Sequence, residues 1–399
     1  METLDVAIIG AGPAGSRAAA TLSCHGNLRI ALFEKAPESK RNATLLTFTD
    51  VPVRYGLGDA VTERYADFSY VYPGRPALRF SYEDATLVAM DYRKMCSLLR
   101  KNAVTSGNVK LVPGEVTGLE EMEDGLDLAL KDGSRIRSRY VIDASGKTHL
   151  ACKALGLPLP ALYSHVLGYY VEVPGEIPRP LAVFFSPHSD FGNGGGWLYS
   201  AGKHHVSFGY AAVRKFSEHP AGGLEKIFQA AREALSRDYP FLAEGKLLHV
   251  ETASIPLNPT GKLVQGRVAI TGDAAALATN WMCMGIEPAL WSGEAAARTI
   301  AANLLEPGDH DGTAPPYPEA WETRCGPAYR EMTAFSHAFW SFSDSMWEFI
   351  LRYDLQKLTP EKFLERMKHN AHRMSRGTFC WRYLLFRIKK MFGPGSREN

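Results

Sequence analysis

Apolar and polar positions at the start of the chain follow a strand, helix, strand order. Residues 6–9 (VAII) and 28–33 (LRIALF) are short runs rich in branched and aromatic side chains. Such runs are typical of strands buried on both faces of a parallel sheet. Residues 18–22, between them, continue in strong helix formers. This order predicts the first unit of a parallel sheet with helices on its faces.

Later stretches extend the same pattern. Residues 268–270 form another apolar run, and residues 287–305 follow as a long helical pattern. Residues 91–104 also read as a helix, and the Asp-Gly pair at 132–133 marks a turn in a strand pair around 109–142. These stretches predict that the parallel sheet is assembled from separated parts of the chain.

A different pattern fills the gaps between these parts. Residues 51–84 and 156–254 alternate aromatic and branched residues with turns, which predicts an antiparallel sheet, interrupted by a helix at 222–242. The Pro/Gly/Asp-rich stretch 306–319 reads as a linker, followed by aromatic-rich helices. One apolar face of these helices comprises Phe335, Phe339, Phe342, Met346 and Phe349.

We therefore predict an α/β protein: a Rossmann-like nucleotide-binding domain with an interleaved antiparallel-sheet substrate domain and C-terminal helices. The predicted segments are 1–50, 85–155 and 255–305 for the first domain, 51–84 and 156–254 for the second, and 306–399 for the helical region.

Composition narrows the class of protein. The chain has 399 residues, 45% of them hydrophobic and 22% charged, which are globular values. A net charge of +2 argues against a nucleic-acid binder, which needs a concentrated basic face. The six cysteines are scattered without a C-x-x-C pair, so we expect no metal site, no disulfide framework and a cytoplasmic location. No apolar run reaches the roughly 18 residues of a transmembrane helix.

The first loop carries a nucleotide-binding pattern. Residues 10–15 read GAGPAG and fit G-x-G-x-x-G between a strand and a helix. Gly10 allows a tight turn, Gly12 lets the backbone approach a diphosphate, and Gly15 lets helix and strand pack closely. Glu34 ends the second strand and can accept hydrogen bonds from ribose hydroxyls, which favours FAD or NAD. The predicted binding residues are Gly10, Ala11, Gly12, Pro13, Ala14, Gly15 and Glu34.

A second loop favours a flavin. The strand at 268–270 ends in Gly272 and Asp273, and a helix is predicted to begin near Gly285 and Ile286. Asp273 can reach the ribityl and diphosphate region. The helix start can offer backbone N–H groups and a positive dipole end to the electron-rich edge of a reduced isoalloxazine ring.

In these motifs the chain resembles the FAD-dependent geranylgeranyl reductase family, within the flavoproteins that include p-hydroxybenzoate hydroxylase. The matching stretches are DVAIIGAGPAG at the start, FEK at 33–35, VIDASGKT at 141–148, the strand and loop at 255–276, and GIEPALWSGEAAA at 285–297. The resemblance implies FAD as cofactor. It also implies that Lys35 lies in the FAD site and that the backbone near Val116 contacts the adenine.

Three positions depart from the family pattern. Residues 40–50 lack the cysteine and paired glycines common after the second strand, and Tyr92 stands where an arginine is frequent. The proline usual after Gly-Asp-Ala-Ala is absent, and NWMCM occupies that space. These departures concern the substrate and the catalytic groups, while the FAD motifs remain.

Aromatic and sulfur-containing side chains predict an apolar substrate wall. Trp197 and Tyr199 alternate along one strand and should share a face, in a segment similar to the aromatic strand pair that these reductases place over the flavin. If both flavin loops face the ring, the residues between them lie close to it. We therefore expect Trp281, Met282 and Met284 to contact a greasy substrate.

The resemblance implies reduction of isolated C=C bonds in a prenyl chain, by protonation together with hydride from reduced FAD. The predicted acid is Cys283, Tyr199 or an ordered water. The alternatives are a monooxygenase or halogenase on the same scaffold, an isoprenoid cyclase that uses reduced FAD without net redox change, and a non-catalytic FAD protein.

Partners follow from the same interpretation. The substrate is a hydrophobic prenyl lipid, and the electron donor is external, either NAD(P)H or a ferredoxin-like protein, because no second glycine motif is present. The basic, Trp-bearing tail from Arg373 to Met391 predicts peripheral contact with an anionic membrane.

Overall fold

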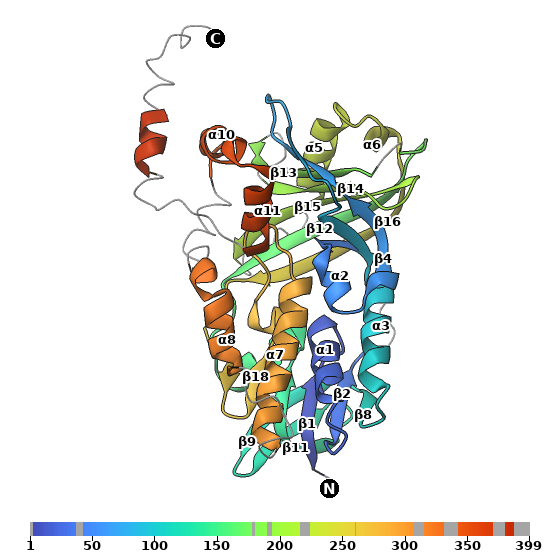
Figure 1. Ribbon diagram of the computed structural model, residues 1–399, viewed down its shortest axis with the longest axis vertical. Helices are drawn as coiled ribbons and strands as arrows, with labels where there is room; N and C mark the ends of the chain where they lie inside the picture. Colours follow the sequence, from blue (N-terminus) through green and yellow to red (C-terminus); the bar gives the residue numbers. More distant parts are fainter. Residues whose placement is uncertain are drawn as a thin grey trace.

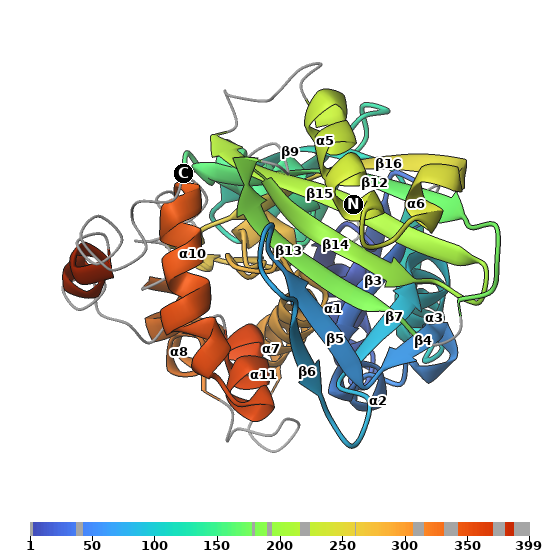
Figure 2. The same cartoon turned by 90° about the horizontal axis from the view of Figure 1, so that it is seen from above.

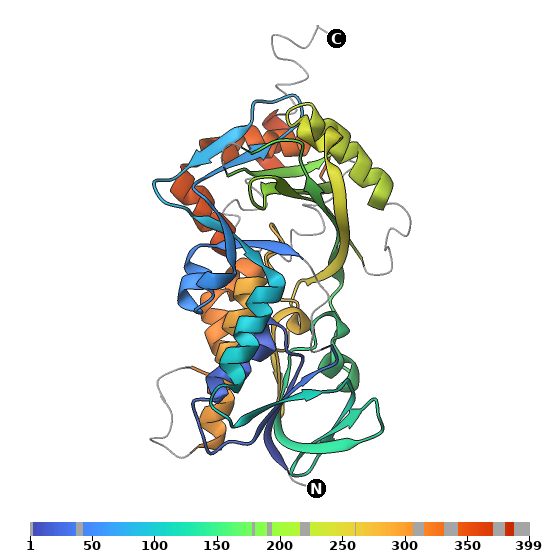
Figure 3. The same ribbon diagram turned by 90° about the vertical axis from the view of Figure 1, so that its right-hand side faces the viewer.

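The protein consists of two large sheets at opposite ends of its long axis, with helices along one side (Figures 1 and 3). The computed structural model describes residues 3–36, 43–177, 180–189, 194–215, 224–259, 261–305, 315–330, 342–369 and 380–386.

The first sheet has eight strands with a parallel centre. Its main order is β17-β18-β11-β1-β2-β8, and the neighbours from β18 to β8 run parallel. β1 and β2 are buried almost throughout because helices and loops cover both faces. The strands are β1 (Leu4–Ile9), β2 (Ile30–Glu34), β8 (Val109–Pro113), β9 (Val116–Met122), β10 (Gly125–Leu130), β11 (Arg135–Asp143), β17 (Val264–Gln265) and β18 (Val268–Ile270).

Four helices accompany this sheet: α1 (Pro13–Leu22), α3 (Tyr92–Val104), α7 (Ile286–Leu304) and α8 (Tyr317–Arg324). α1 and α7 pack with their backbones in contact, since a Cβ on Gly293 would come 2.9 Å from the Ala14 carbonyl carbon. Asp91 caps α3, accepting a hydrogen bond from the Lys94 backbone N–H at 2.9 Å. Both α1 and α7 begin beside the edge where the parallel strands end, which is where α/β sheets bind ligands.

The second sheet has seven strands in the order β16-β12-β15-β14-β13-β5-β6. Its strands are β5 (Asp67–Val71), β6 (Leu78–Ser81), β12 (Leu162–Glu172), β13 (Ala182–His188), β14 (Gly194–Ser200), β15 (His205–Lys215) and β16 (Lys246–Leu257). Helices α5 (Leu224–Ser236) and α6 (Phe241–Glu244) cover its outer face, where Phe228 packs against Tyr169 and Phe208 (Figure 2).

Smaller elements complete the structure around the two sheets. A three-stranded sheet and short helices lie next to α3, and the C-terminal helices lie to one side of the seven-stranded sheet (Figure 2). These elements are β3 (Thr44–Phe48), β4 (Val61–Tyr65), β7 (Leu87–Asp91), α2 (Asp50–Arg54), η1 (Gly58–Ala60), η2 (Gly146–Thr148), α4 (Leu150–Ala154), η5 (Gly272–Ala275), α10 (Asp344–Tyr353), η6 (Leu355–Lys357) and α11 (Pro360–His369).

The predicted fold class is confirmed, but several local predictions differ from the structure. Residues 51–54 and 58–60, expected in the antiparallel sheet, are helical in α2 and η1, and β5 pairs with β13 in parallel. The strand pair expected around 109–142 is four strands, β8 to β11. Residues 114–115 separate β8, which pairs with β2, from β9, and a two-residue turn at 123–124 reverses the chain between β9 and β10. The helix expected at 222–242 is divided into α5 and α6. Pro240 disfavours helical backbone at the residue before it.

The C-terminal prediction is covered only in part. Phe342, Met346 and Phe349 contribute to one apolar core, whereas Phe335 and Phe339 lie outside the described residues. Among the described helices, none has the length and apolarity to cross a bilayer.

Candidate functional site

A cavity of about 460 Å³ runs between the two sheets. It extends from the loop after β1 to the aromatic strands β13 and β14. The structure brings the predicted site residues together here: all of them line the cavity except Ala11, Gly15 and Gly272. Segments separated by more than 250 residues therefore form one site.

The start of α1 forms one end of the cavity. Gly12 is the N-cap of α1 and Pro13 its first residue, and no side chain caps this helix start. A Cβ on Gly12 would meet no protein atom within 4 Å, so this backbone faces open cavity. Uncapped N–H groups, a positive dipole end and this open space fit the diphosphate of FAD.

Ala11 and Gly15 do not line the cavity but support the loop between β1 and α1. Gly10 has φ +97°, and a Cβ on Gly15 would overlap the Gly10 carbonyl oxygen. Ala11 is buried. Its carbonyl oxygen accepts hydrogen bonds from Arg100 Nε at 3.2 Å and from Ser16 Oγ at 3.0 Å. These contacts fix the path of the loop between β1 and α1.

Glu34, the residue expected to bind ribose hydroxyls, lies at the end of β2 and lines the cavity. Its Oε2 accepts from the Ala11 N–H and its Oε1 from the Ala36 N–H, both at 2.9 Å. Each carboxylate oxygen can accept a second hydrogen bond, so the ribose hydroxyls can still bind here. Lys35 lies 3.8 Å from Glu115, and both line the cavity beside Val116.

The second cofactor turn is η5, after β18. Gly272 has φ +56°, and a Cβ there would lie 3.1 Å from the Ala14 Cβ and 3.3 Å from the Ala289 Cβ. Gly272 therefore packs between α1 and α7, which explains why it does not line the cavity. Asp273 lines the cavity next to Gly285. Gly285 is the N-cap residue of α7, and no side chain caps this helix start.

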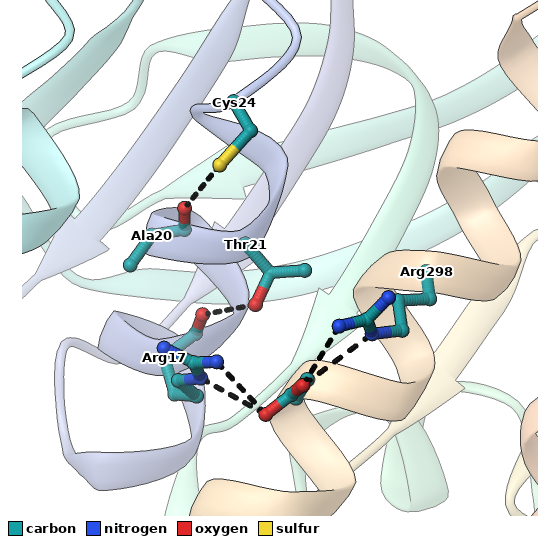
Figure 4. Close-up of polar contacts among 6 residues, drawn as sticks. Arg17, Ala20, Thr21, Cys24 and Arg298 are labelled. Atoms are coloured by element: carbon teal, nitrogen blue, oxygen red, sulfur yellow. Dashed lines mark hydrogen bonds and ion pairs between the residues drawn. The ribbon is translucent and has the colours of Figure 1, made fainter. Parts of the chain in front are cut away.

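An ion-pair cluster holds α1 and α7 together below this turn. Arg17 on α1 and Arg298 on α7 turn their guanidinium groups toward the Glu294 carboxylate, at 2.9 and 3.1 Å (Figure 4). Although burial opposes it, the two arginines hold the pKa of Glu294 below its usual value. The helix starts that fit the diphosphate and the flavin ring are thus fixed relative to each other.

Buried polar groups that the sequence did not reveal support the two turns. Asp143 accepts from the Ser145 N–H at 2.9 Å and the Ala151 N–H at 2.7 Å, and burial raises the pKa of its carboxyl. His149 contacts the Ala274 carbonyl oxygen through Nδ1, at 2.9 Å. The VIDASGKT stretch placed this segment in the site, but residues 149 and 274 are too far apart in sequence for their contact to show.

Trp197 lies flat on the seven-stranded sheet at the other end of the cavity. Its Cζ2 is 3.9 Å from where a Cβ on Gly168 would lie, and a Cβ on Gly209 would overlap the ring. The indole Nε1 donates to Ser207 Oγ at 3.1 Å. Two glycines and one hydroxyl therefore set the orientation of the indole face.

Tyr199 shares this wall, as alternation predicted. Its hydroxyl donates to the Thr44 carbonyl oxygen, and its ring meets Tyr65 edge to face, with centroids 6.3 Å apart. Further aromatic residues that the sequence analysis did not single out line the cavity: Tyr70, Phe184 and Trp347. Tyr92 also lines the cavity; it stands where the resembled flavoproteins frequently have an arginine.

The loop before α7 closes the cavity with the four residues Trp281 to Met284. Two hydrogen bonds between residues 279 and 284, both 3.0 Å, brace the loop, and Cys283 has φ +53°. Burial raises the pKa of the Cys283 thiol to about 11, with the Ser164 hydroxyl opposing the shift. The thiol is therefore protonated at neutral pH.

Sequence comparisons agree with this geometry. A family model described as lycopene cyclase protein matches residues 5–181. Geranylgeranyl diphosphate reductase from Arabidopsis thaliana is 23% identical over 393 residues, covering 90% of this chain and 80% of the relative. The Synechocystis enzyme of that name is 25% identical over 90% of this chain and 92% of its own. Rifampicin monooxygenase from Streptomyces venezuelae is 28% identical, but the match spans only 36% of that protein.

Solved structures show the same fold. A geranylgeranyl bacteriochlorophyll reductase-like protein from Thermoplasma acidophilum has a TM-score of 0.77 at 16% identity, covering 98% of this chain and 99% of the other. The flavin-dependent brominase Bmp2 has a TM-score of 0.69 at 16% identity, with the same coverage. With FAD as its cofactor, the chain is thus similar to the geranylgeranyl diphosphate reductases over 90% of its length, and it shares its fold with flavin-dependent proteins.

Proposed function

We propose that the protein reduces isolated C=C bonds in a prenyl, geranylgeranyl-type chain. The observation that carries this proposal is the apolar and aromatic wall beyond the second cofactor turn, which includes Trp197, Trp281 and Met282. Such a wall suits a long hydrocarbon and excludes water. The names of two relatives that match 90% of the chain support the same substrate class.

Reduction of an unactivated alkene needs a proton and a hydride. Bound and reduced, FAD supplies the hydride. The protein must then provide a proton donor and stabilise positive charge on the other alkene carbon. The face of Trp197 is open to the cavity and fixed on the sheet, so it can stabilise such a charge as a cation–π partner.

Cys283 is the proton donor that we propose. The Tyr199 hydroxyl already donates its proton to the Thr44 carbonyl oxygen, which competes with transfer to a substrate. Cys283 lines the cavity and keeps its thiol protonated, with the Ser164 hydroxyl beside it. Electrons reach the site from an external NAD(P)H or ferredoxin-like donor in this proposal.

Product mass distinguishes the proposed function from its alternatives. Incubation of the protein with a geranylgeranyl lipid and a reductant should add pairs of hydrogen atoms to the lipid. Oxygen or halogen gain would indicate a monooxygenase or halogenase, and an isomer of unchanged mass would indicate a cyclase.

The same assay tests the proposed proton donor. Cys283→Ala should slow hydrogen gain about 100-fold while FAD stays bound, because a positioned acid contributes about that factor. Cys96→Ala is the matched control, since Cys96 is buried on α3 outside the cavity lining. An undiminished rate in Cys283→Ala would remove this residue from the mechanism.

We also propose that the C-terminal segment touches an anionic membrane and keeps a cytoplasmic protein near its lipid substrate. Residues 380–386 are helical: Phe386 packs against Phe349 and Tyr353, whereas Trp381, Leu384 and Leu385 are 63%, 49% and 41% exposed. An outward Trp/Leu face suits a lipid interface. The predicted basic residues Arg373, Arg376, Arg387, Lys389 and Lys390 lie outside the described residues.

Vesicle sedimentation tests this contact. Wild-type protein should bind vesicles that contain phosphatidylglycerol, and Trp381→Ser with Leu384→Ser should abolish most of that binding. Val53→Ser removes a side chain that is 76% exposed on α2 and should have no effect. Equal binding by all three proteins would refute the contact.

A further inference from the structure

His149 lies between the two turns that face the cofactor end of the cavity. It follows η2, whose Gly146 and Thr148 line the cavity, and its own backbone is left-handed, with φ +50°. Its side chain is 2% exposed and reaches across to η5, where Nδ1 is 2.9 Å from the Ala274 carbonyl oxygen. One residue thus joins η2 to the turn that carries Asp273.

The partners of the two ring nitrogens indicate the protonation state of His149. A carbonyl oxygen can only accept, so Nδ1 of His149 carries the proton. Nε2 is then an acceptor in the neutral ring, and the Tyr163 hydroxyl lies 3.1 Å from it as the donor. Burial lowers the pKa of His149, which agrees with a neutral imidazole. The Ala274 carbonyl therefore selects the tautomer, and Tyr163 stabilises it by donating to Nε2.

Tyr163 belongs to the opposite half of the molecule. It lies on β12, in the seven-stranded sheet, and the same strand contributes Val166, Gly168 and Tyr170 to the cavity wall. The hydrogen-bonded path from Tyr163 through His149 to Ala274 thus connects the substrate-side sheet to the cofactor turn.

We propose that His149 is a positioning residue that holds η5, and with it Asp273, in the position that FAD requires. Tyr163 orients the imidazole through its hydrogen bond to Nε2. His149 touches neither cofactor nor substrate in this role. The inference concerns FAD binding and is independent of the proposed prenyl substrate.

FAD titration of the apoprotein tests this role. His149→Ala removes the bond to Ala274 and should weaken FAD binding about tenfold, the value of one buried hydrogen bond. The visible flavin spectrum should also shift as Asp273 moves. His149→Asn should restore affinity and spectrum, because its amide can donate to the same carbonyl and asparagine tolerates left-handed backbone.

A surface histidine provides the matched control. His204 is exposed in the turn between β14 and β15, and its Nδ1 lies 3.2 Å from the Gly175 carbonyl oxygen. His204→Ala removes a similar contact and should leave FAD affinity unchanged. The inference is overturned if His149→Ala binds FAD as tightly as wild type, whether or not its melting temperature falls.

Tyr163→Phe keeps the inference testable if His149→Ala fails to fold. Loss of the hydroxyl removes the hydrogen bond to Nε2, so the imidazole is held less firmly, while the aromatic ring continues to fill its place. We expect FAD affinity to fall about threefold, less than the full value of one hydrogen bond. Unchanged affinity and an unchanged flavin spectrum in this variant would overturn the inference.

Discussion

Replacing Gly15 with alanine is expected to give a protein that no longer retains FAD. The new Cβ would overlap the Gly10 carbonyl oxygen and lie 3.1 Å from the Ala144 Cβ. Both atoms belong to backbone-defined positions next to β1 and β11, so neither can rotate away. Relief requires the start of α1 to move off the sheet, and with it the N–H groups that fit the diphosphate. Overpacking of this kind costs up to about 3 kcal/mol, which corresponds to more than 100-fold in affinity.

Flavin absorbance of the purified protein and FAD titration measure this effect. Gly26→Ala is the control, since a Cβ on Gly26 meets no protein atom within 4 Å. Gly12→Ala adds a second comparison: its Cβ also meets no protein atom, so folding should persist while the methyl group occupies the diphosphate space. A Gly15→Ala protein that binds FAD as tightly as wild type would contradict this account of the loop.

Gly209→Ala is expected to displace Trp197 and to slow prenyl reduction about 30-fold, because a desolvated cation–π contact of about 2 kcal/mol is lost. The atoms nearest to a Cβ on Gly209 all belong to the Trp197 ring, and the Cβ would overlap them. The indole can only move away from the sheet and into the cavity. FAD binding at the other end of the cavity should be unaffected.

A double variant separates steric strain from chemistry. Adding Trp197→Ala to Gly209→Ala removes the clash, so the melting temperature should return toward the wild-type value. The rate should stay low, because the aromatic face is absent. Gly175→Ala, where a Cβ has no neighbour within 4 Å, serves as the control. If the double variant recovers the rate as well as the stability, the Trp197 face has no role in the reaction.

Sequence patterns predicted the cofactor end of the site well, because its requirements are local. The G-x-G-x-x-G spacing demands a strand, a turn and a helix in a fixed order, and the structure has β1, Gly10 and α1 at these positions. The start of α7 at Ile286 was predicted for the same reason, from a glycine followed by a helical pattern.

Contacts between distant segments could not be predicted in this way. His149 and Ala274 are 125 residues apart, and nothing in either stretch indicates the other. The backbone conformation of the loop from Ala276 to Gly285 could not be predicted either, since Ala276 and Cys283 adopt positive φ values that their residue types do not suggest. Tertiary packing decides such features.

Anaerobic mixing of the reduced protein with a geranylgeranyl lipid tests the proposed prenyl reduction itself, with flavin absorbance and product mass followed together. We expect the lipid to reoxidise the flavin without oxygen and to gain a pair of hydrogen atoms for each flavin. A flavin that stays reduced beside an unchanged lipid until air is admitted would contradict the proposed reduction.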